Sequence, residues 1–468
     1  MPQRQPMDDL VVILPGITGS ALSVKGKAVW DVSGSAVVNG VRALGRSVDK
    51  LRLPDGFGNT LPIGEQEGEP EDGVHATRLI GGLHFIPGVW SPVKGYEPLV
   101  RYFLDEFVAF RSGEGRPGNL LEFPYDWRLS NVVSARRLLS AIGPELETWR
   151  RQDGKADAKL VLVCHSMGGL VARWFLEKLG GWEYTRWLIT IGTPYQGSMM
   201  AVDALGNGLR KGPKWFGKNL TPLVRSFPSM YELLPAYKCW DTGNGSLARL
   251  VDARGHGLDA AMLAAGAKFH DELSAAVAAR PERGYRTMAI KGVTQPTFLT
   301  AKAGAGRIEL VRSYGGTDKG GDGTVPRPSA HPPEWASELD GEVIGYSQRH
   351  AALQETPAVL TQLFTRLTAA RLGAFMGEED FGLDLPHSLQ AGEDLRVEGF
   401  SKHSNLPVQL TVTGYETREG LAQSFMSPLG EGSYEATFGG LPPGAYEIEA
   451  TGPVGTVTSV RDVFVIWP

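Results

Sequence analysis

The feature that most constrains the fold is an apolar run that ends in a serine between small residues, VLVCHSMGG at 161–169. Residues 160–163 are all Val or Leu, as expected for a strand buried on both faces of a parallel sheet. Residues 170–179 then carry apolar side chains at helical spacing on one broad face. A strand, a sharp turn and a helix in this order are typical of a nucleophile elbow, which exposes one serine hydroxyl. The pattern therefore predicts an α/β fold with Ser166 as nucleophile.

Cys164 departs from the usual elbow, which has glycine two residues before the serine. Cysteine is small and often buried, so the turn remains compatible with it. Gly168 and Gly169 leave room where the helix must approach the strand. An ordinary serine in a turn is the alternative, but the flanking strand and helix favour a nucleophile. Because Cys239 is the only other cysteine, no disulfide framework is expected.

Length and composition limit the class of protein. A chain of 468 residues exceeds what one hydrophobic core usually supports, so two domains are expected. A net charge of −5 without a basic block argues against nucleic acid as a partner. No run approaches the ~20 apolar residues that span a bilayer. The polar start at 1–9 lacks the regions of a signal peptide, which favours a cytoplasmic protein, with a secretion signal already removed as the alternative.

A second loop complements the elbow. The short apolar strand Leu10–Leu14 leads into PGITGS at 15–20. Acyl transfer needs main-chain N–H groups directed at the developing oxyanion, one from the residue after the nucleophile and one from an early strand loop. We expect Met167 to supply the first N–H and Ile17 the second. A phosphate-binding loop is the alternative, but the P-loop spacing and its lysine are absent from this sequence.

A serine hydroxyl needs an imidazole to accept its proton and a carboxylate to hold that imidazole in one tautomer. On an α/β-hydrolase architecture these residues follow in the order serine, acid, histidine. Asp322 lies in the glycine-flanked turn GDGTVP at 321–326, which suits the presentation of one carboxylate, and Asp318 is its nearby rival. A calcium loop would need more ligands than these two aspartates provide. The predicted chemistry requires no metal or organic cofactor.

His350 is the expected base because it precedes a predicted helix over 357–372. Three other histidines follow Asp322, in a proline-rich loop and in the last quarter of the chain: His331, His387 and His403. The predicted catalytic set is therefore Ser166, Asp322 and His350.

Strands alternate with helices in the rest of the first 372 residues, as is typical of an α/β domain. Helices are expected over 97–110 and 132–149, and strands over 120–125, 187–191, 286–291 and 307–311. Residues 24–95, rich in Gly, Pro and charge, are too long for a simple loop and predict a lid-like insertion. Residues 200–285 mix helical patterns with Pro and aromatic residues and predict a cap.

The segment PYDWR at 124–128 places an acid two residues before a base. Asp126 and Arg128 are expected to form an ion pair that braces a loop, and a catalytic role is the alternative.

From about Leu383 the chain becomes a series of short alternating segments separated by Gly- and Pro-containing turns. Strand-sized pieces at intervals of roughly ten residues predict a small antiparallel β-sandwich. We therefore expect an α/β-hydrolase catalytic domain at 1–384 and a β-sandwich accessory domain at 387–468. The sandwich is expected either to dock a protein partner or carbohydrate or to act as a passive stabilising appendage.

Together these residues resemble the lecithin:cholesterol acyltransferase and lysosomal phospholipase A2 family of α/β-hydrolases. The resemblance runs in order from Leu10 to about Leu372 and rests on VILPG at 12–16, PYDWR at 124–128, HSMG at 165–168, IGTP at 191–194, LLP at 233–235, GDGTV at 321–325 and His350. It implies ester hydrolysis or acyl transfer on lipids, with a lid within 24–95 and a cap within 200–285. The family's lid disulfide has no counterpart here, and the last part of the chain lies outside the resemblance.

The function that these expectations favour is a serine hydrolase or acyltransferase that cleaves carboxylic esters of lipids through an acyl-enzyme on Ser166. Its substrate would be met at a transient membrane or micelle surface. An esterase or thioesterase for small soluble acyl compounds would use the same residues. A non-catalytic binding scaffold is the third alternative, disfavoured by the complete set of serine, acid and histidine.

Overall fold

A computed structural model describes residues 4–31, 48–54, 57, 70, 72–82, 93–112, 117–208, 220–280, 282, 284–335, 341–368, 375–376, 381–452, 457 and 459–468. Within these ranges, no helix is both long and apolar enough to cross a bilayer.

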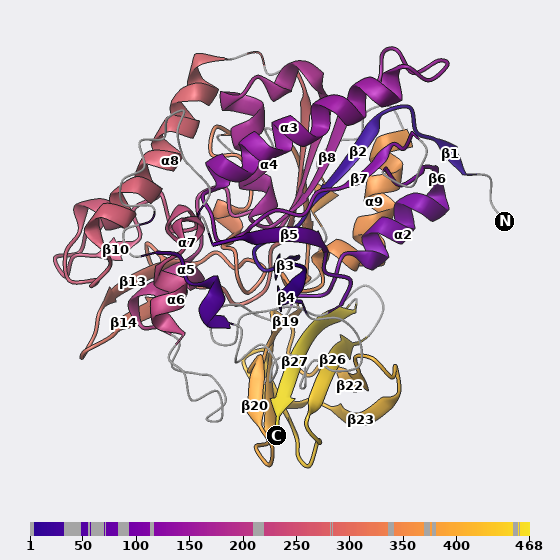
Figure 1. The fold of residues 1–468 in the computed structure, drawn as a ribbon. Coiled ribbons are helices and arrows are strands. Elements are labelled where there is room, and N and C mark those ends of the chain that lie inside the picture. The colour runs from indigo at the N-terminus through magenta and orange to yellow at the C-terminus, as the bar shows by residue number, and fades with distance from the viewer. Residues whose placement is uncertain are drawn as a thin grey trace.

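A seven-stranded sheet forms the centre of the structure (Figure 1), and every neighbouring pair in it is parallel. Its strands, in spatial order, are β18 (Phe375–Met376), β17 (Glu342–Tyr346), β12 (Arg286–Gly292), β9 (Thr185–Ile191), β8 (Leu160–His165), β2 (Leu10–Leu14) and β7 (Leu120–Glu122). The predicted strands at 10–14, 160–163, 187–191 and 286–291 all lie in this sheet. The α/β class expected from the sequence is therefore confirmed.

Both faces of the sheet are covered by helices, which explains why its strands are continuously apolar. On β2, Leu10, Val12 and Leu14 belong to one hydrophobic cluster, whereas Val11 and Ile13 belong to another. The first cluster includes side chains of α3 (Asn131–Arg150) and α4 (Gly168–Lys178). The second includes side chains of α2 (Glu97–Glu106) and α9 (Pro357–Thr368), on the opposite side of the sheet (Figure 1).

The helix predicted over 97–110 ends earlier than expected. It stops at Glu106, and Phe107–Val108 forms β6, which pairs in parallel with β1 (Gln5–Pro6). The backbone at Phe107 adopts an extended conformation. The Phe107 ring is buried, while the Val108 side chain is 42% exposed. Pairing with a distant segment therefore prevails over the local helical pattern.

The structure describes part of each predicted insertion. Within 24–95, the end of β3 (Ser20–Val24) pairs with β4 (Lys27–Trp30) and β5 (Val74–Leu79) in an antiparallel sheet, with the 3-10 turn η1 (Val48–Leu51). Residues 32–47, 55–56, 58–69, 71 and 83–92 lie outside the described ranges. The 200–285 segment contains the end of α5 (Met199–Gly206), α6 (Thr221–Arg225), α7 (Pro228–Glu232), β10 (Trp240–Asp241), β11 (Leu247–Ala248), η4 (Leu250–Asp252) and α8 (Ala260–Ala279).

The strand predicted at 307–311 forms, but outside the central sheet. It is β14 (Ile308–Val311), which joins β13 (Thr300–Ala303), β10 and β11 in a four-stranded sheet. The remaining short elements before residue 375 are η2 (Gly181–Tyr184), β15 (Ser313–Tyr314), β16 (Thr317–Asp318), η5 (Arg327–Ser329) and η6 (Leu353–Glu355).

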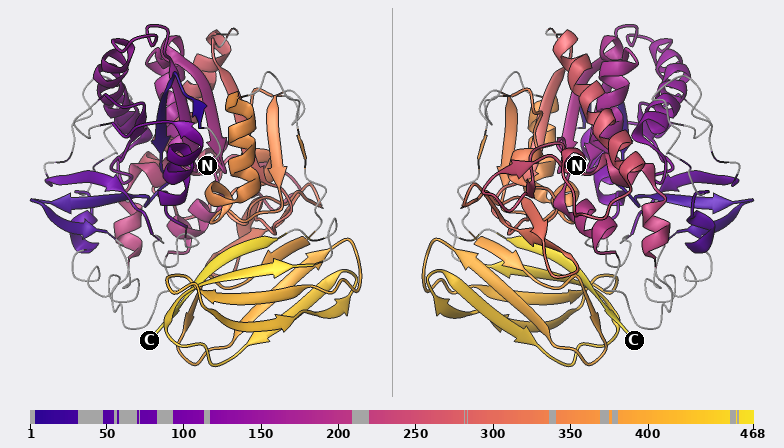
Figure 2. Two further views of the ribbon diagram at one scale, coloured as in Figure 1. Left: turned by 90° about the vertical axis from the view of Figure 1, so that its right-hand side faces the viewer. Right: turned by 90° about the vertical axis from the view of Figure 1, so that its left-hand side faces the viewer.

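Residues 381–467 form two further sheets, here called the C-terminal sheets, which gather below the rest of the chain (Figure 2). One contains β19 (Phe381–Asp384), β21 (Leu395–Ser401), β25 (Ser433–Phe438) and β24 (Ser427–Gly430). The other contains β20 (Ser388–Gln390), β27 (Val460–Trp467), β26 (Gly444–Thr451), β22 (Gln409–Gly414) and β23 (Gly420–Phe425). Apart from the parallel β20–β27 pair, neighbouring strands are antiparallel, and both sheets contribute to one hydrophobic cluster.

Candidate active site

The candidate site lies where the strands of the central sheet end. Ser166 directly follows β8, the Ile17 loop follows β2, and His350 comes shortly after β17. Parallel strands bring their carboxyl ends to one edge of a sheet, which is where open α/β folds bind their ligands. Since β2 and β8 are neighbours, the Ile17 loop and the elbow meet there.

Ser166 adopts a left-handed backbone conformation with φ of 50°. A non-glycine residue seldom takes this conformation, which costs energy and recurs at functional sites. The turn is fixed by a hydrogen bond from Ser166 N to Ile191 O of 2.9 Å and by one from Thr193 Oγ1 to Ser166 O, also 2.9 Å. A Cβ at Gly168 would lie 2.5 Å from the Pro15 carbonyl oxygen, so only glycine fits there. This geometry is that of a nucleophile elbow.

The structure brings the three predicted side chains together. His350 Nε2 lies 3.0 Å from Ser166 Oγ, and His350 Nδ1 lies 2.7 Å from Asp322 Oδ2. An ionised carboxylate can only accept hydrogen bonds, so this contact places the proton on Nδ1 and leaves Nε2 to accept the serine proton. The arrangement can activate a serine hydroxyl for attack on a carbonyl carbon.

Asp322 is itself held in place. Its Oδ1 accepts hydrogen bonds from the main-chain N–H of Thr324 at 2.9 Å and of Val325 at 2.6 Å. The main chain adds a bond of 2.8 Å from His350 N to Asp322 O. Ser166, Asp322 and His350 are at most 2% exposed. Burial strengthens electrostatic interactions among these groups because little water screens them.

The loop expected to supply an oxyanion donor lies against the elbow. A Cβ at Gly16 would be 2.8 Å from Ser166 Cβ, which shows how closely this main chain approaches the serine. Ile17 follows at once, and Met167 follows Ser166 in the turn before α4. Among the described residues, neither the Ile17 nor the Met167 N–H donates a hydrogen bond to another protein group. Both expected donors thus lie beside Ser166, and their role in catalysis stays a prediction.

Two buried residues near the site were missed by the sequence analysis. The Tyr96 hydroxyl accepts a hydrogen bond of 2.7 Å from Gly16 N and lies 2.9 Å from His165 Nδ1. The His165 ring is 5.0 Å from the His350 ring, centroid to centroid. Burial raises the pKa of the Tyr96 hydroxyl, which keeps it protonated. His165 directly precedes Ser166, the predicted nucleophile, and this position is a signal in the sequence, whereas Tyr96 has no such signal.

The rival site candidates make other contacts. Asp318 is exposed on β16, where its Oδ1 accepts a hydrogen bond from Gly320 N. His331 Nδ1 lies 3.1 Å from Lys291 Nζ, and His403 is exposed. His387 is near Arg349, at 3.4 Å from Nη2.

The PYDWR segment forms the brace that was expected. Arg128 Nε and Nη2 donate to the two Asp126 carboxylate oxygens at 2.9 and 2.6 Å. Arg128 Nη1 also donates to Asp72 Oδ2 at 2.9 Å and to Leu51 O at 3.0 Å. The guanidinium therefore ties the loop after β7 to two points of the 24–95 segment.

The fold and the site together define an α/β protein with a serine, histidine and aspartate at the carboxyl edge of a parallel sheet. Residues 107–255 match the family model for lecithin:cholesterol acyltransferase, which confirms the resemblance drawn from the motifs. The match includes the elbow and ends before Asp322 and His350. It supports, at the level of the family, an ester hydrolase or acyltransferase acting on lipids.

Comparison with curated proteins gives no match. Among solved structures, the chain is similar to one in the Tle4–Tli4 complex, with 16% identity, a TM-score of 0.45, and coverage of 78% of this chain and 98% of that one. It is also similar to Bacillus licheniformis lipase BlEst2 in its propeptide form, with 10% identity, a TM-score of 0.33, and coverage of 99% and 95%.

Proposed function

We propose that this protein is a serine hydrolase or acyltransferase that cleaves carboxylic esters of lipids through an acyl-enzyme on Ser166. The observation that carries the proposal is the continuous hydrogen-bonded series from Ser166 Oγ through His350 to Asp322, with contacts of 3.0 and 2.7 Å. The family match over 107–255 supports the class of substrate.

In the first half of the proposed reaction, Ser166 Oγ attacks the ester carbonyl carbon while His350 Nε2 takes the hydroxyl proton. Asp322 stabilises the imidazolium that forms. The N–H groups of Ile17 and Met167 donate to the negatively charged oxygen of the tetrahedral intermediate. The C–O bond to the leaving alcohol then breaks, and His350 gives that alcohol its proton.

In the second half, water or an acceptor alcohol attacks the acyl-enzyme, with His350 Nε2 again as base. Collapse of the second tetrahedral intermediate releases the acid or the new ester and restores the serine hydroxyl. Whether the product is an acid or an ester depends on which acceptor reaches the acyl-enzyme.

The surroundings of the site suggest how substrates are selected. We propose that the 24–95 and 200–285 segments act as lid and cap, and that the substrate is met at a membrane or micelle surface. We propose a catalytic unit at 1–384 and an accessory unit at 387–468, with β19 at the end of the first unit pairing with β21 of the second.

The competing function is an esterase or thioesterase for small soluble acyl compounds. The observation that favours it is the burial of the nucleophile, which is 2% exposed. A serine this buried leaves more room for a small ester than for a long acyl chain.

Hydrolysis of p-nitrophenyl esters from acetate to palmitate, with and without mixed micelles, separates these functions. Cleavage that favours long chains and increases with micelles is expected for the lipid enzyme. A preference for acetate or butyrate without a micelle effect would support the small-ester enzyme. Ser166→Ala should be inactive on every ester, whereas Ser140→Ala, at an exposed position of α3, should match the wild type.

A further inference from the structure

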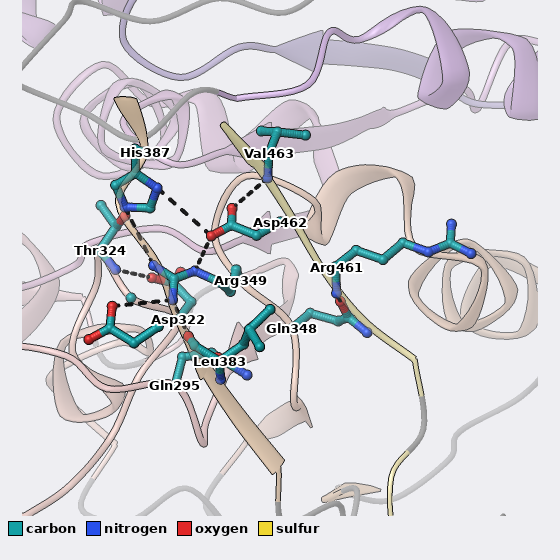
Figure 3. Close-up of polar contacts among 12 residues, drawn as sticks. Gln295, Asp322, Thr324, Gln348, Arg349, Leu383, His387, Arg461, Asp462 and Val463 are labelled. Carbon is teal, nitrogen blue, oxygen red and sulfur yellow. Dashed lines mark hydrogen bonds and ion pairs between the residues drawn. The ribbon is translucent and has the colours of Figure 1, made fainter. Parts of the chain in front are cut away.

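The segment that carries His350 is attached to the C-terminal sheets by a buried ion pair (Figure 3). Arg349, which directly precedes His350, places its Nε 2.6 Å from Asp462 Oδ2 on β27. Its Nη1 donates to the Leu383 carbonyl oxygen on β19. The two charged side chains are 5% and 0% exposed, so solvent screens their attraction very little.

The same arginine also lies against the turn that carries Asp322. Gly323 has a φ of +87°, and a Cβ built on it would lie 3.0 Å from Arg349 Nη2. One guanidinium of the His350 segment therefore contacts the Asp322 turn and two strands of the C-terminal sheets.

A buried glutamine links the same three parts a second time. The Gln295 main-chain N–H donates to Gly321 O at 3.0 Å, next to Asp322. Its side-chain Nε2 donates to Ser347 O at 3.0 Å, and its Oε1 accepts from Leu383 N at 2.9 Å. Gln348 adds bonds to the chain entering β27, because its Nε2 donates to Ser459 O and its Oε1 accepts from Arg461 N at 3.3 Å.

The far end of the His350 segment is fastened in a similar way. The buried Lys94 forms ion pairs with Glu355, five residues after His350, and with Glu447 on β26 at 2.5 Å. Lys94 N also donates to Ala351 O at 3.1 Å. The segment is thus connected to the C-terminal sheets on both sides of His350.

From Val463 to Trp467, strand β27 is apolar on both of its faces. Val463, Val465 and Trp467 belong to the cluster that contains α3 and α4 side chains, whereas Phe464 and Ile466 belong to the cluster inside the C-terminal sheets. Separating these sheets from the rest of the chain would expose the first set to water, which is unfavourable. The ion pair is therefore built on a rigid, buried support.

From these contacts we infer that the C-terminal sheets position the His350 imidazole for catalysis, with Arg349 and Asp462 as positioning residues. This inference rests on the proposed function, since it assigns a role in the same reaction. A displacement of about 1 Å in a catalytic group can lower a rate about 100-fold. The two other roles considered for this part of the chain were docking of a partner and passive stabilisation. Neither would require a charged contact directly beside His350.

The test compares Arg349→Met, Asp462→Leu and the double variant in the full chain. Each single change leaves a buried charge without its nearest partner, which destabilises, whereas replacing both with apolar groups is often neutral. Arg366→Met is the matched control, because Arg366 is a buried arginine on α9 that pairs with Glu342 at 3.2 Å. The measurements are kcat, KM, the thermal midpoint, and the downfield proton NMR resonance of the His350–Asp322 hydrogen bond, assigned with Asp322→Asn.

We expect both single variants to lose kcat about 100-fold with little change in KM, and to lose the downfield resonance. The double variant should recover thermal stability but neither kcat nor the resonance. Arg366→Met should keep the wild-type kcat and the downfield resonance even if its thermal midpoint falls. Arg349→Lys retains the charge but not the forked geometry, so its kcat should lie between those of the wild type and Arg349→Met. It takes the place of Arg349→Met in the comparison if that variant does not fold.

Two results would overturn the inference. One is a double variant or an Arg349→Lys variant with wild-type kcat and resonance; the other is a loss of kcat in Arg366→Met as large as in Arg349→Met. A wild type without Ser166-dependent turnover would instead refute the proposed function. In that case the resonance still reports whether Arg349 and Asp462 hold the imidazole.

Discussion

At the scale of the residue, the main feature is the left-handed conformation of Ser166, with φ of 50°. For an L-residue this conformation costs roughly 1–2 kcal/mol. The hydrogen bonds of the turn maintain it, since Ser166 N donates to Ile191 O and Ser166 O accepts from Thr193 Oγ1. The proposed nucleophile is thus also a residue with a strained backbone, a combination that is common in active sites.

Replacing this serine separates strain from chemistry. Ser166→Gly and Ser166→Ala should both be inactive, but the glycine variant should be more stable than the alanine variant by about 1 kcal/mol, because glycine adopts positive φ without strain. Urea unfolding of the two variants measures the difference. An alanine variant as stable as the glycine variant would show that the turn is not strained.

Asp322 holds His350 in one tautomer through Oδ2, at 2.7 Å from Nδ1. In Asp322→Asn, the amide no longer favours the proton on Nδ1, and kcat should fall by roughly 10⁴-fold. Steady-state kinetics test this loss, with Asp318→Asn as the exposed control that should retain full activity. Combining Asp322→Asn with Ser166→Ala should add little, because these residues act as a unit. An Asp322→Asn variant that retains most of its activity would reject the assignment of the carboxylate.

At the scale of the element, buried polar groups tie helices and loops together. On α8, the His270 ring lies 2.8 Å from the Glu232 carbonyl oxygen at the end of α7. In the loop that follows β7, Arg128 is completely buried between Asp126 and Asp72. The first contact joins residues 38 positions apart in the sequence, and the Arg128–Asp72 pair joins residues 56 positions apart.

The stability of the α7–α8 contact should depend on pH. Burial lowers the pKa of His270 from 6.5 to about 4, against a raising effect of its hydrogen bond to Glu232 O. The unfolded chain therefore binds more protons between pH 6.5 and about 4, so stability is complete above pH 6.5 and falls as the pH is lowered. The loss attributable to His270 is at most about 3 kcal/mol. Urea unfolding measures the free energy of unfolding at each pH. This free energy should fall less steeply with acid in His270→Gln than in the wild type, whereas His403→Gln, at an exposed position, should match the wild type. Equal pH slopes for His270→Gln and the wild type would contradict this account.

The Arg128 brace should be structural. Arg128→Met leaves the buried Asp126 without its cation, which is expected to lower the free energy of unfolding by about 3–5 kcal/mol. Arg101→Met, which removes a 69% exposed arginine from its pair with Glu97, should cost no more than about 0.5 kcal/mol. Chemical unfolding of both variants tests the contrast. An Arg128→Met variant as stable as Arg101→Met would contradict the brace.

The elements differ in how far the sequence predicts them. The strands Leu10–Leu14 and Leu160–His165 were predictable because burial on both faces makes them continuously apolar. Phe107–Val108 was not, since its pairing with β1 depends on a segment about 100 residues away. Strand β17, directly before the His350 segment, was also missed. The serine, acid and histidine were predictable from motif order, whereas Gln295 and Asp462 act through contacts that only the folded chain creates.

At the scale of the whole molecule, the candidate site depends on parts far apart in sequence. The Ile17 loop, the elbow, the Asp322 turn and the His350 segment meet because the central strands are parallel and end at one edge. The C-terminal sheets lie at this edge as well, through Arg349–Asp462 and the apolar face of β27. We therefore infer that the C-terminal sheets support the candidate site, and we expect changes in their packing to alter the proposed activity.

The central claim, an acyl-enzyme on Ser166, is tested most directly by mass spectrometry of the protein quenched during turnover of the preferred p-nitrophenyl ester. We predict a mass increase of one acyl group on the peptide that contains Ser166, formed together with a burst of p-nitrophenol. The adduct and the burst should both be absent from Ser166→Ala. Turnover that persists in Ser166→Ala, with no acylated peptide in the wild type, would contradict the account.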